Sequence, residues 1–262
     1  MISFYKFAPL VKPEECRDTL FEKIQEIPGL RGSIYLAQEG INAQMAVPPE
    51  HLDEFVKACS TSVSFDLFAD DDEKPNLGNV LPISTPTFNR LIVRTRDYVL
   101  RDGIDDHAEV GGTTLDWNNA GPELEANEWH EAVMDTNSSS SKAALLDCRN
   151  FYESDEGTFR GATPLATNIF QDSWSQLDGM TKDLSKDEPV YIFCTGGIRC
   201  VKVGAYLKQR LGFDNVKRLK NGIIGYQKWA DEKISDETSA WEGENFLFDK
   251  RREIKSKEEV NE

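Results

Sequence analysis

Residues 190–200 of this chain have the sequence VYIFCTGGIRC. An apolar run typical of a short buried strand leads to Cys194, and a glycine-containing turn follows. The next residues, CVKVGAYLKQRLG, have the apolar spacing of a helix that ends at Gly212. A buried strand followed by a tight turn and a helix is the unit from which parallel α/β sheets are built. The stretch therefore predicts an α/β domain with a parallel sheet, and it places Cys194 at the carboxyl end of one strand.

The remainder of the second half repeats the alternation of strands and helices. AALLDCRN and the start of NVKRLKNGIIGYQKW are strand-like, whereas NEWHEAVMD, QDSWSQLDGM and the end of the last stretch are helical. We assign residues 122–235 to this α/β domain, with a parallel sheet. The polyserine stretch at 135–142 is interpreted as an insertion that forms an exposed loop, and 236–262 as a partly disordered C-terminal extension.

The first hundred residues have a different pattern. ISFYKFA, GSIYLAQ, INAQMAV, SVSFDLFA and RLIVRTRDYV are strand-like, and helices are predicted after Pro13 and over PPEHLDEFVKACS. Glu39-Gly40 is a tight-turn signal between two of the strands. The order β-α-β-β-α-β predicts an N-terminal ferredoxin-like domain at residues 1–101. A Gly- and Asp-rich linker is expected at 102–121.

Composition limits the class of protein. The chain has 262 residues with 39% hydrophobic residues, enough to build buried cores, and a formal net charge of −16. No apolar stretch approaches the roughly 18 residues of a membrane span, and the start of the chain resembles neither a signal nor a transit peptide. Five cysteines in a chain of this length are too few for a disulfide scaffold. We expect a cytoplasmic protein in a reducing compartment.

Cys194 is the strongest candidate for a reactive residue. Ligands of open α/β sheets gather at the carboxyl ends of the strands. Backbone N–H groups of the turn and the following helix N-terminus favour an anion there, and Arg199 adds a fixed positive charge. These features predict a thiolate at neutral pH. The expected active-site loop comprises Thr195, Gly196, Gly197, Ile198, Arg199 and Cys200.

Other interpretations of the same loop are weaker. A cysteine at the end of a buried strand can be a small hydrophobic residue, which is the interpretation we prefer for Cys16, Cys59 and Cys148. GGIRC lacks the Gly-Lys-Ser/Thr ending of a phosphate-binding loop. No metal site is expected, because the three histidines are scattered and no two cysteines have the two-residue spacing of zinc ligands. Protein tyrosine phosphatases resemble the loop, but they have five residues between cysteine and arginine where this chain has four.

Several stretches together resemble a known family. DCRNFYESDEGTFRGATPL, VYIFCTGGIRC and GFDNVKRLKNGIIGYQKW resemble a rhodanese domain. Preceded by FYKFAPL and LAQEGINAQMAV, they make the chain similar to the tRNA uridine(34) hydroxylase family over nearly its whole length. The resemblance implies oxygen-dependent hydroxylation of the wobble uridine 34 of tRNA to 5-hydroxyuridine, with Cys194 as the active cysteine. It also implies molecular oxygen as co-substrate and tRNA as partner.

The chain departs from the family at several points. Members commonly have Glu-Lys after the second loop cysteine, where this chain has Val201 and Lys202, and the cysteine-rich tail of many members is missing. No iron- or flavin-binding motif is visible, so no further cofactor is identifiable, and no protein partner can be inferred.

Two supporting sites have two interpretations each. Asp147 and Arg149 match the family's DxRN segment; Arg149 contributes to the loop, or, as we prefer, the two form a salt bridge that holds the strand end. Cys200 resolves an oxidised or persulfidated Cys194 by forming a disulfide, or it packs inward at the start of a helix.

Contacts to tRNA must be local, because the chain as a whole is acidic. Arg90, Arg94 and Arg96 share one face of a strand at period two, and Lys202 follows the loop, although for the helix lysines we prefer a solvated charged face without a binding role. Asn42 could contact a base, although Gly40 and Asn42 also suit a hairpin turn without any such role. For Phe4, Tyr5 and Phe7 we prefer core packing over stacking on a base.

Three functions are therefore compared. The first is tRNA uridine hydroxylation with Cys194 essential. The alternative is a sulfurtransferase that moves sulfane sulfur through a Cys194 persulfide, which the loop supports but the N-terminal domain does not require. The third is a regulatory binding module that retains the loop as a relic, against which the intact Cys194 and Arg199 argue.

Overall fold

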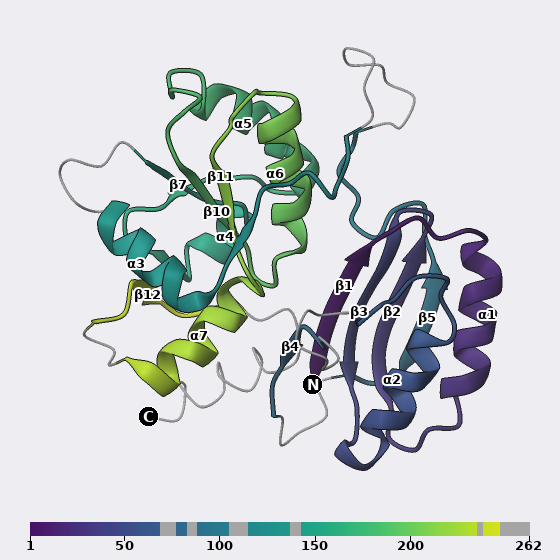
Figure 1. Cartoon of the computed structure of the whole chain (residues 1–262). Coiled ribbons are helices and arrows are strands. Elements are labelled where there is room, and N and C mark those ends of the chain that lie inside the picture. The colour runs from purple at the N-terminus through teal and green to yellow at the C-terminus, as the bar shows by residue number, and fades with distance from the viewer. Residues whose placement is uncertain (69–76, 83–87, 105–114, 137–142, 235–237, 247–262) are drawn as a thin grey trace. The chain divides into compact units, whose positions relative to one another are not determined.

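The structure, a computed structural model, describes residues 1–68, 77–82, 88–104, 115–136, 143–234 and 238–246. Its described residues form two compact units, Met1–Val99 and Leu100–Phe246, shown in Figure 1. The serines of the polyserine stretch, the middle of the expected linker at 105–114 and the end of the C-terminal extension at 247–262 lie outside the described residues. No helix within the described ranges is long and apolar enough to cross a membrane.

The first unit is a mixed sheet covered by helices. Its elements are β1 (Ile2–Phe7), α1 (Pro13–Ile24), β2 (Arg31–Ala37), β3 (Gly40–Ala46), the 3-10 turn η1 (Pro49–His51), α2 (Leu52–Ser60), β4 (Asn79–Val80) and β5 (Leu91–Thr95). The strand order is β4-β1-β3-β2-β5. Strand β3 is antiparallel to both β1 and β2, whereas β2 and β5 are parallel. The predicted ferredoxin-like order is confirmed for this unit.

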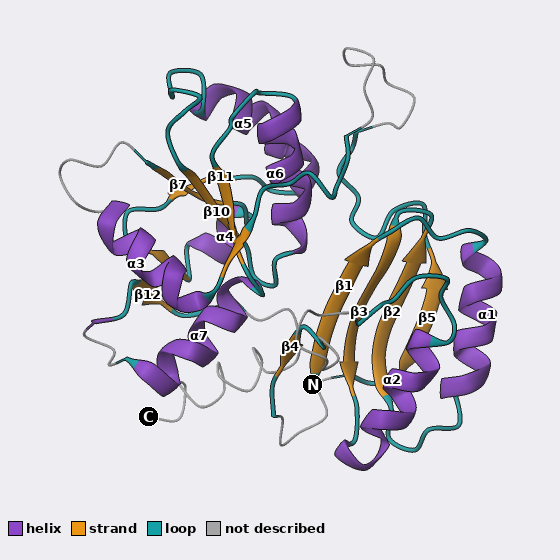
Figure 2. Cartoon of the chain, viewed as in Figure 1, coloured by secondary structure: helices purple, strands orange, loops and turns teal. Residues whose placement is uncertain are grey.

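The helices of this unit lie on one face of its sheet (Figure 2). Pro13 occupies the first turn of α1, where no backbone N–H is needed, and Leu20 and Ile24 face inward. The inward positions of the strands, such as Ile34 and Val93, join the same hydrophobic core as α2's Phe55. Strand side chains alternate between faces, so the intervening residues of β1, β2, β3 and β5 project from the other face of the sheet.

Two details of the first unit differ from the sequence-based expectation. SVSFDLFA does not form a strand over its described residues; Leu67 and Phe68 instead pack into the core from bends. The strand after α2 that lies beside β1 is the short β4. The predicted strand in RLIVRTRDYV is present as β5, but it adds to the opposite edge beside β2. Apolar content indicated burial here, which bends satisfy as well as strands do.

The second unit is a parallel sheet with helices on both faces. Its strands are β6 (Glu123–Leu124), β7 (Ala144–Asp147), β8 (Gly157–Phe159), β9 (Thr163–Pro164), β10 (Val190–Phe193), β11 (Val216–Leu219) and β12 (Trp241–Gly243). Its helices are α3 (Ala126–Thr136), α4 (Phe151–Ser154), η2 (Phe170–Asp172), α5 (Ser173–Met180), α6 (Ile198–Gln209) and α7 (Gly222–Lys233). The main sheet has the order β6-β11-β10-β7-β9, and all its pairings are parallel.

Strand β10 lies inside this sheet and contributes to a hydrophobic core on each side. Val190 and Ile192 pack with Leu177 of α5 and Leu207 of α6. Phe193 packs on the other side in a core formed largely by α3 and α7, which includes Trp129 and Tyr226. The predicted α/β class with a parallel sheet is therefore confirmed. Strand β12, from the expected C-terminal extension, pairs with β8 in a separate antiparallel ladder.

Candidate active site

Cys194 lies at the end of β10, where the chain turns into α6. The cysteine is fully buried, and its Sγ accepts a hydrogen bond from the backbone N–H of Gly197 at 3.2 Å. Gly197 precedes the first turn of α6 and has φ of 95°, a left-handed conformation that glycine adopts without strain. The predicted arrangement of strand, glycine turn and helix N-terminus around the sulfur is thus present.

The N-terminus of α7 fixes the backbone of the same loop. The N–H groups of Ile223 and Ile224 donate to the carbonyl oxygens of Cys194 and Thr195, at 3.0 and 3.2 Å. Gly222 has φ of 60°, and a Cβ atom there would lie 2.4 Å from the Cys194 oxygen. Gly222 is therefore required for the close approach of α7 to the loop. Sequence reasoning did not single out Gly222 and missed this role.

Arg199 points to a carboxylate rather than to the sulfur. Its two terminal nitrogens donate to the two oxygens of Glu153, at 2.6 and 2.7 Å. Thr195 joins the same network, since its hydroxyl donates to Glu153 at 3.0 Å and accepts from Arg199 at 3.1 Å. Glu153 is fully buried. Burial alone would raise the pKa of Glu153, but the hydrogen bonds and charge of Arg199 outweigh it and lower that pKa.

Sequence reasoning did not single out Glu153. One signal was available: Asn150 and Glu153 have the N-x-x-E spacing of a capping box, and the backbone N–H of Asn150 donates to the Glu153 carboxylate at 3.1 Å at the start of α4. The capping bond places the carboxyl group beside the loop, where it neutralises the guanidinium of Arg199.

The prediction of a Cys194 thiolate at neutral pH is wrong for this conformation. Burial raises the pKa of the Cys194 thiol well above its ordinary value, and the neighbouring Cys200 thiol raises it further. The charge of Arg199 and the backbone N–H of Cys200 act in the opposite direction but do not outweigh burial. The physical reason is twofold: the sulfur has no contact with water, and Glu153 offsets the positive charge on which the prediction relied.

Two further cysteines adjoin Cys194 in the core. Cys200 and Cys148 are buried, and the Cys200 thiol interacts with the thiols of both Cys194 and Cys148. Burial also raises the pKa of Cys200 well above its ordinary value. This placement agrees with the interpretation of Cys200 as an inward-packed residue at a helix start. It also puts the Cys200 thiol beside Cys194, with which it would form the resolving disulfide. Val201, the next residue of α6, is buried as well.

Asp147 and Arg149 form a buried salt bridge at the end of β7. Arg149 donates from Nε and Nη2 to the two carboxylate oxygens of Asp147, at 2.9 and 2.6 Å. Its remaining donors reach the carbonyl oxygens of Glu153 and Gly157. The preferred structural interpretation of this pair agrees with these bonds, because the side-chain hydrogen bonds of Arg149 tie β7 to α4 and β8.

Lys202 is not placed to contact tRNA, and its prediction as an RNA-binding residue is wrong here. The side chain is fully buried. Its Nζ donates to Asp102 at 2.6 Å and to the carbonyl oxygen of Leu100 at 2.9 Å, and it lies 4.8 Å from the ring centroid of Trp117. Sequence proximity to the loop suggested exposure, but the first turns of α6 point this position into the core. Lys202 instead anchors the chain segment at the start of the second unit.

The remaining predicted tRNA contacts lie in the first unit. Arg90, Arg94 and Arg96 are all exposed. Asn42 is half-buried, and its side-chain amide donates to the carbonyl oxygen of Val99 at 3.4 Å. Glu39, in the same turn, accepts from the N–H of Val99 at 2.8 Å. The Glu39–Asn42 turn therefore holds the end of the first unit in addition to closing the β2–β3 hairpin.

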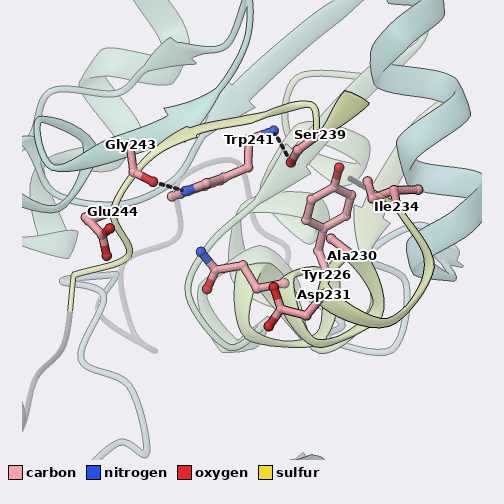
Figure 3. Close-up of a pocket in the computed structure, with 9 residues that line it drawn as sticks. Tyr226, Ala230, Asp231, Ile234, Ser239, Trp241, Gly243 and Glu244 are labelled. Atoms are coloured by element: carbon pink, nitrogen blue, oxygen red, sulfur yellow. Dashed lines mark hydrogen bonds between the residues drawn. The ribbon is translucent and has the colours of Figure 1, made fainter. Parts of the chain in front are cut away.

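A pocket of about 470 Å³ lies along α7 in the second unit (Figure 3). It is lined by Tyr226, Gln227, Ala230, Asp231, Ile234, Ser239, Trp241, Gly243 and Glu244. Figure 3 shows the Trp241 ring held by its bond to the Gly243 carbonyl oxygen, at 2.8 Å. No residue of the 194–200 loop lines this pocket. Its two carboxylates also disfavour a phosphate-rich ligand, so we do not assign RNA to it.

The fold and the loop define a class of protein. A ferredoxin-like unit precedes a parallel α/β unit in which a central strand ends in a loop cysteine, the arrangement of a rhodanese-like domain. Residues 1–99 match the family described as UPF0176 acylphosphatase like domain, and residues 127–231 match the rhodanese-like domain family. Among solved structures, a rhodanese-like domain from Anabaena sp. is 19% identical and covers 47% of this chain and 80% of its own, with a TM-score of 0.35.

Curated relatives match nearly the whole chain. A tRNA uridine(34) hydroxylase from Legionella pneumophila (strain Corby) is 34% identical over 255 residues, which cover 97% of this chain and 90% of that protein. One from Hamiltonella defensa is 33% identical and covers 99% and 67%, respectively. A third, from Leptospira interrogans, is 32% identical and covers 95% and 62%, so this chain spans less than two thirds of that protein. The chain belongs to the tRNA uridine(34) hydroxylase family.

Proposed function

We propose that this chain hydroxylates uridine 34 of tRNA and that Cys194 is its essential residue. The observation that carries the proposal is the combination of the family with an intact cysteine loop, in which Gly197 donates to the Cys194 sulfur. A relic loop would not need to retain the contacts from α7 and Glu153 that hold it. The substrate implies work in the compartment where tRNA is found, the cytoplasm.

The residues around Cys194 have different roles in the site. The backbone N–H groups of Gly197 and Cys200 would stabilise the negative charge that forms on the sulfur when the thiol loses its proton. Glu153 holds Arg199 and Thr195, and α7 holds the loop carbonyl oxygens, so that both act as positioning elements. The sulfur is buried and protonated at rest, which protects it from solvent oxidants. Molecular oxygen is the co-substrate that family membership implies.

Expression in cells whose own tRNA uridine hydroxylation has been removed tests the proposal. Nucleosides from purified tRNA are analysed by mass spectrometry. We expect uridine 34 to gain the mass of one oxygen atom only when this chain is expressed. Unmodified uridine 34, with the protein present and folded, would overturn the proposed function.

The same protein tests the alternative activity, sulfur transfer. Incubation with thiosulfate followed by intact-mass measurement reports whether Cys194 gains one sulfur atom, and cyanide reports whether that sulfur is transferred. Rapid turnover of thiosulfate in a protein that leaves uridine 34 unmodified would favour a sulfurtransferase. The names of the relatives favour hydroxylation.

A further inference from the structure

The face of the first unit's sheet that α1 and α2 do not cover carries a row of aromatic and polar side chains. In the strand register Tyr5 of β1 pairs with Asn42 of β3, Asn42 with Tyr35 of β2, and Tyr35 with Arg94 of β5. Directly paired residues project from the same face. We call Tyr5, Asn42, Tyr35 and Arg94 the cross-strand row. Three of them are half-buried and Arg94 is exposed.

The position of Tyr5 corrects an expectation. Phe4 is in the core, as predicted for all three aromatic residues of β1. Tyr5 and Phe7 instead project from the opposite face. Their rings pack edge to face with centroids 6.1 Å apart, and both residues are half-buried.

This face is basic although the chain as a whole is acidic. Arg31, Arg90, Arg94 and Arg96 are exposed on it or at its ends. None of the outward positions of β1, β2, β3 and β5 is an aspartate or glutamate. Within the described residues no carboxylate pairs with Arg31, Arg90 or Arg94, whereas the exposed Arg160 of the second unit pairs with Glu242. Unpaired arginines in a chain of net charge −16 indicate an anionic ligand at this face.

The row also offers flat surfaces for stacking. The guanidinium of Arg96 lies 4.1 Å from the ring centroid of Tyr35, so the two form a stacked pair. Tyrosine rings and arginine planes are the surfaces on which unpaired bases stack, and neighbouring arginines bind the phosphates between them. The amide of Asn42, between the two tyrosines, donates one N–H to the Val99 carbonyl oxygen and, in the described part of the chain, has its other N–H and its oxygen left for a base edge. A double helix, with its bases already stacked, could not use these rings.

We propose that this sheet face binds unpaired nucleotides of an RNA strand, by stacking bases on Tyr5 and on the Tyr35–Arg96 pair and by binding phosphates with Arg94, Arg90 and Arg31. The row crosses three strand spacings, about 14 Å, which suits two or three nucleotides. The identity of the RNA rests on the proposed function: uridine 34 lies in the unpaired anticodon loop of tRNA. The sheet face then selects an RNA loop, and the Cys194 loop carries out the chemistry.

Binding measurements with the full chain test this inference. Fluorescence anisotropy compares a labelled hairpin RNA that has an unpaired, uridine-containing loop with a duplex RNA of similar length. The hairpin should bind more tightly. Tyr35→Ala should weaken hairpin binding by about fivefold to a hundredfold, the effect of losing one stacked base, and Tyr35→Phe should retain binding. Arg94→Ala should lower the slope of log affinity against log salt by about 0.7, the value for one phosphate contact on a single strand.

Lys57 supplies a matched control, because it is exposed on α2, on the helical side of the same unit. Lys57→Glu should leave hairpin affinity close to that of the wild type, whereas Arg94→Glu, with the same change in charge, should weaken it strongly. Thermal unfolding verifies that each variant is folded. Equal effects of Lys57→Glu and Arg94→Glu, or equal binding of hairpin and duplex, would overturn the inference.

The two proposals fail in different ways. If the wild type hydroxylates uridine 34 and the Tyr35→Ala and Arg94→Glu variants bind and modify tRNA equally well, the sheet-face inference is wrong and the activity stands. If the hairpin binds through Tyr35 and Arg94 but uridine 34 stays unmodified, the activity is wrong and the RNA-binding face stands.

Discussion

Replacing Glu153 by glutamine removes the negative charge that neutralises Arg199 beside the cysteine loop. Glutamine has nearly the same shape and can still accept a hydrogen bond, so the change isolates charge from packing. In the wild type both carboxylate oxygens bond to Arg199, and one of them also accepts from Thr195. Glu153 is fully buried and the Arg199 side chain is 11% exposed, so water cannot take the place of the lost charge.

Loss of one partner of a buried ion pair costs about 3–5 kcal/mol, because the other charge is left uncompensated. For a unit of this size, about 3–5 kcal/mol corresponds to a decrease in Tm of about 6 to 20 °C. The matched control is Glu242→Gln, which alters a Glu–Arg pair of the same unit whose side chains are 57% and 48% exposed. That variant should lose less than about 1 kcal/mol. A Glu153→Gln variant as stable as Glu242→Gln would refute the account of this network.

The same substitution has a second, chemical readout. With Glu153 neutral, the Arg199 charge is no longer offset, so the pKa of the Cys194 thiol should move down from its raised value. Alkylation by iodoacetamide, followed by mass spectrometry of the Cys194 peptide, gives the pH midpoint. The midpoint should be lower in Glu153→Gln than in the wild type, and an unchanged or higher midpoint would contradict the assigned role of Arg199.

The change in stability at acid pH tests the direction of the Glu153 pKa shift. The folded-state pKa of Glu153 is lowered, so its contribution to stability is present above the unfolded-state value of about 4.3 and is lost as pH falls through the folded-state pKa. The stability difference between wild type and Glu153→Gln should therefore be constant near neutral pH and shrink below about pH 4.3. A difference that grew on acidification would have the wrong sign.

Two further substitutions test the packing around the loop. Gly222→Ala would place a Cβ atom 2.4 Å from the Cys194 oxygen and 2.6 Å from the Thr195 oxygen, so it should abolish uridine hydroxylation. The control is Gly179→Ala, whose Cβ atom would have no atom within 4 Å and which should leave hydroxylation intact. Equal activity of the two variants would contradict the role of Gly222. Lys202→Met should lower the free energy of unfolding in urea by about 3–5 kcal/mol, because it leaves the Asp102 carboxylate buried without a cation. Adding Asp102→Asn should recover part of that loss. Additive effects of the two changes on the free energy of unfolding would argue against a coupled pair.

Much of the architecture could be predicted because the local patterns agree with the final packing. Apolar runs bounded by turn residues predicted β7 and β10, and apolar spacing predicted α6 and α7. Cys194 stood out because strand, glycine turn and helix start follow one another directly in the sequence. Alternation predicted that Arg94 and Arg96 share a face, which the exposure of both agrees with.

Other features depend on contacts between residues far apart in the chain. Nothing near Arg199 in the sequence indicates that Glu153, 46 residues earlier, takes its charge. The sequence around Lys202 does not indicate burial, because its partner in the core, Asp102, lies one hundred residues away in the chain. The fourth strand of the first unit was assigned to a segment whose apolar residues are buried in bends, because burial alone does not distinguish the two.

The most direct test of the central claim compares cysteine variants in cells that lack other tRNA uridine hydroxylation. Cys194→Ser changes the proposed reacting atom, and Cys59→Ser changes a buried cysteine in the core of the other unit. The account predicts that uridine 34 carries the added oxygen in cells with the wild type and with folded Cys59→Ser, and lacks it with Cys194→Ser present at the same level. Normal hydroxylation by Cys194→Ser would contradict the claim that Cys194 is the essential residue.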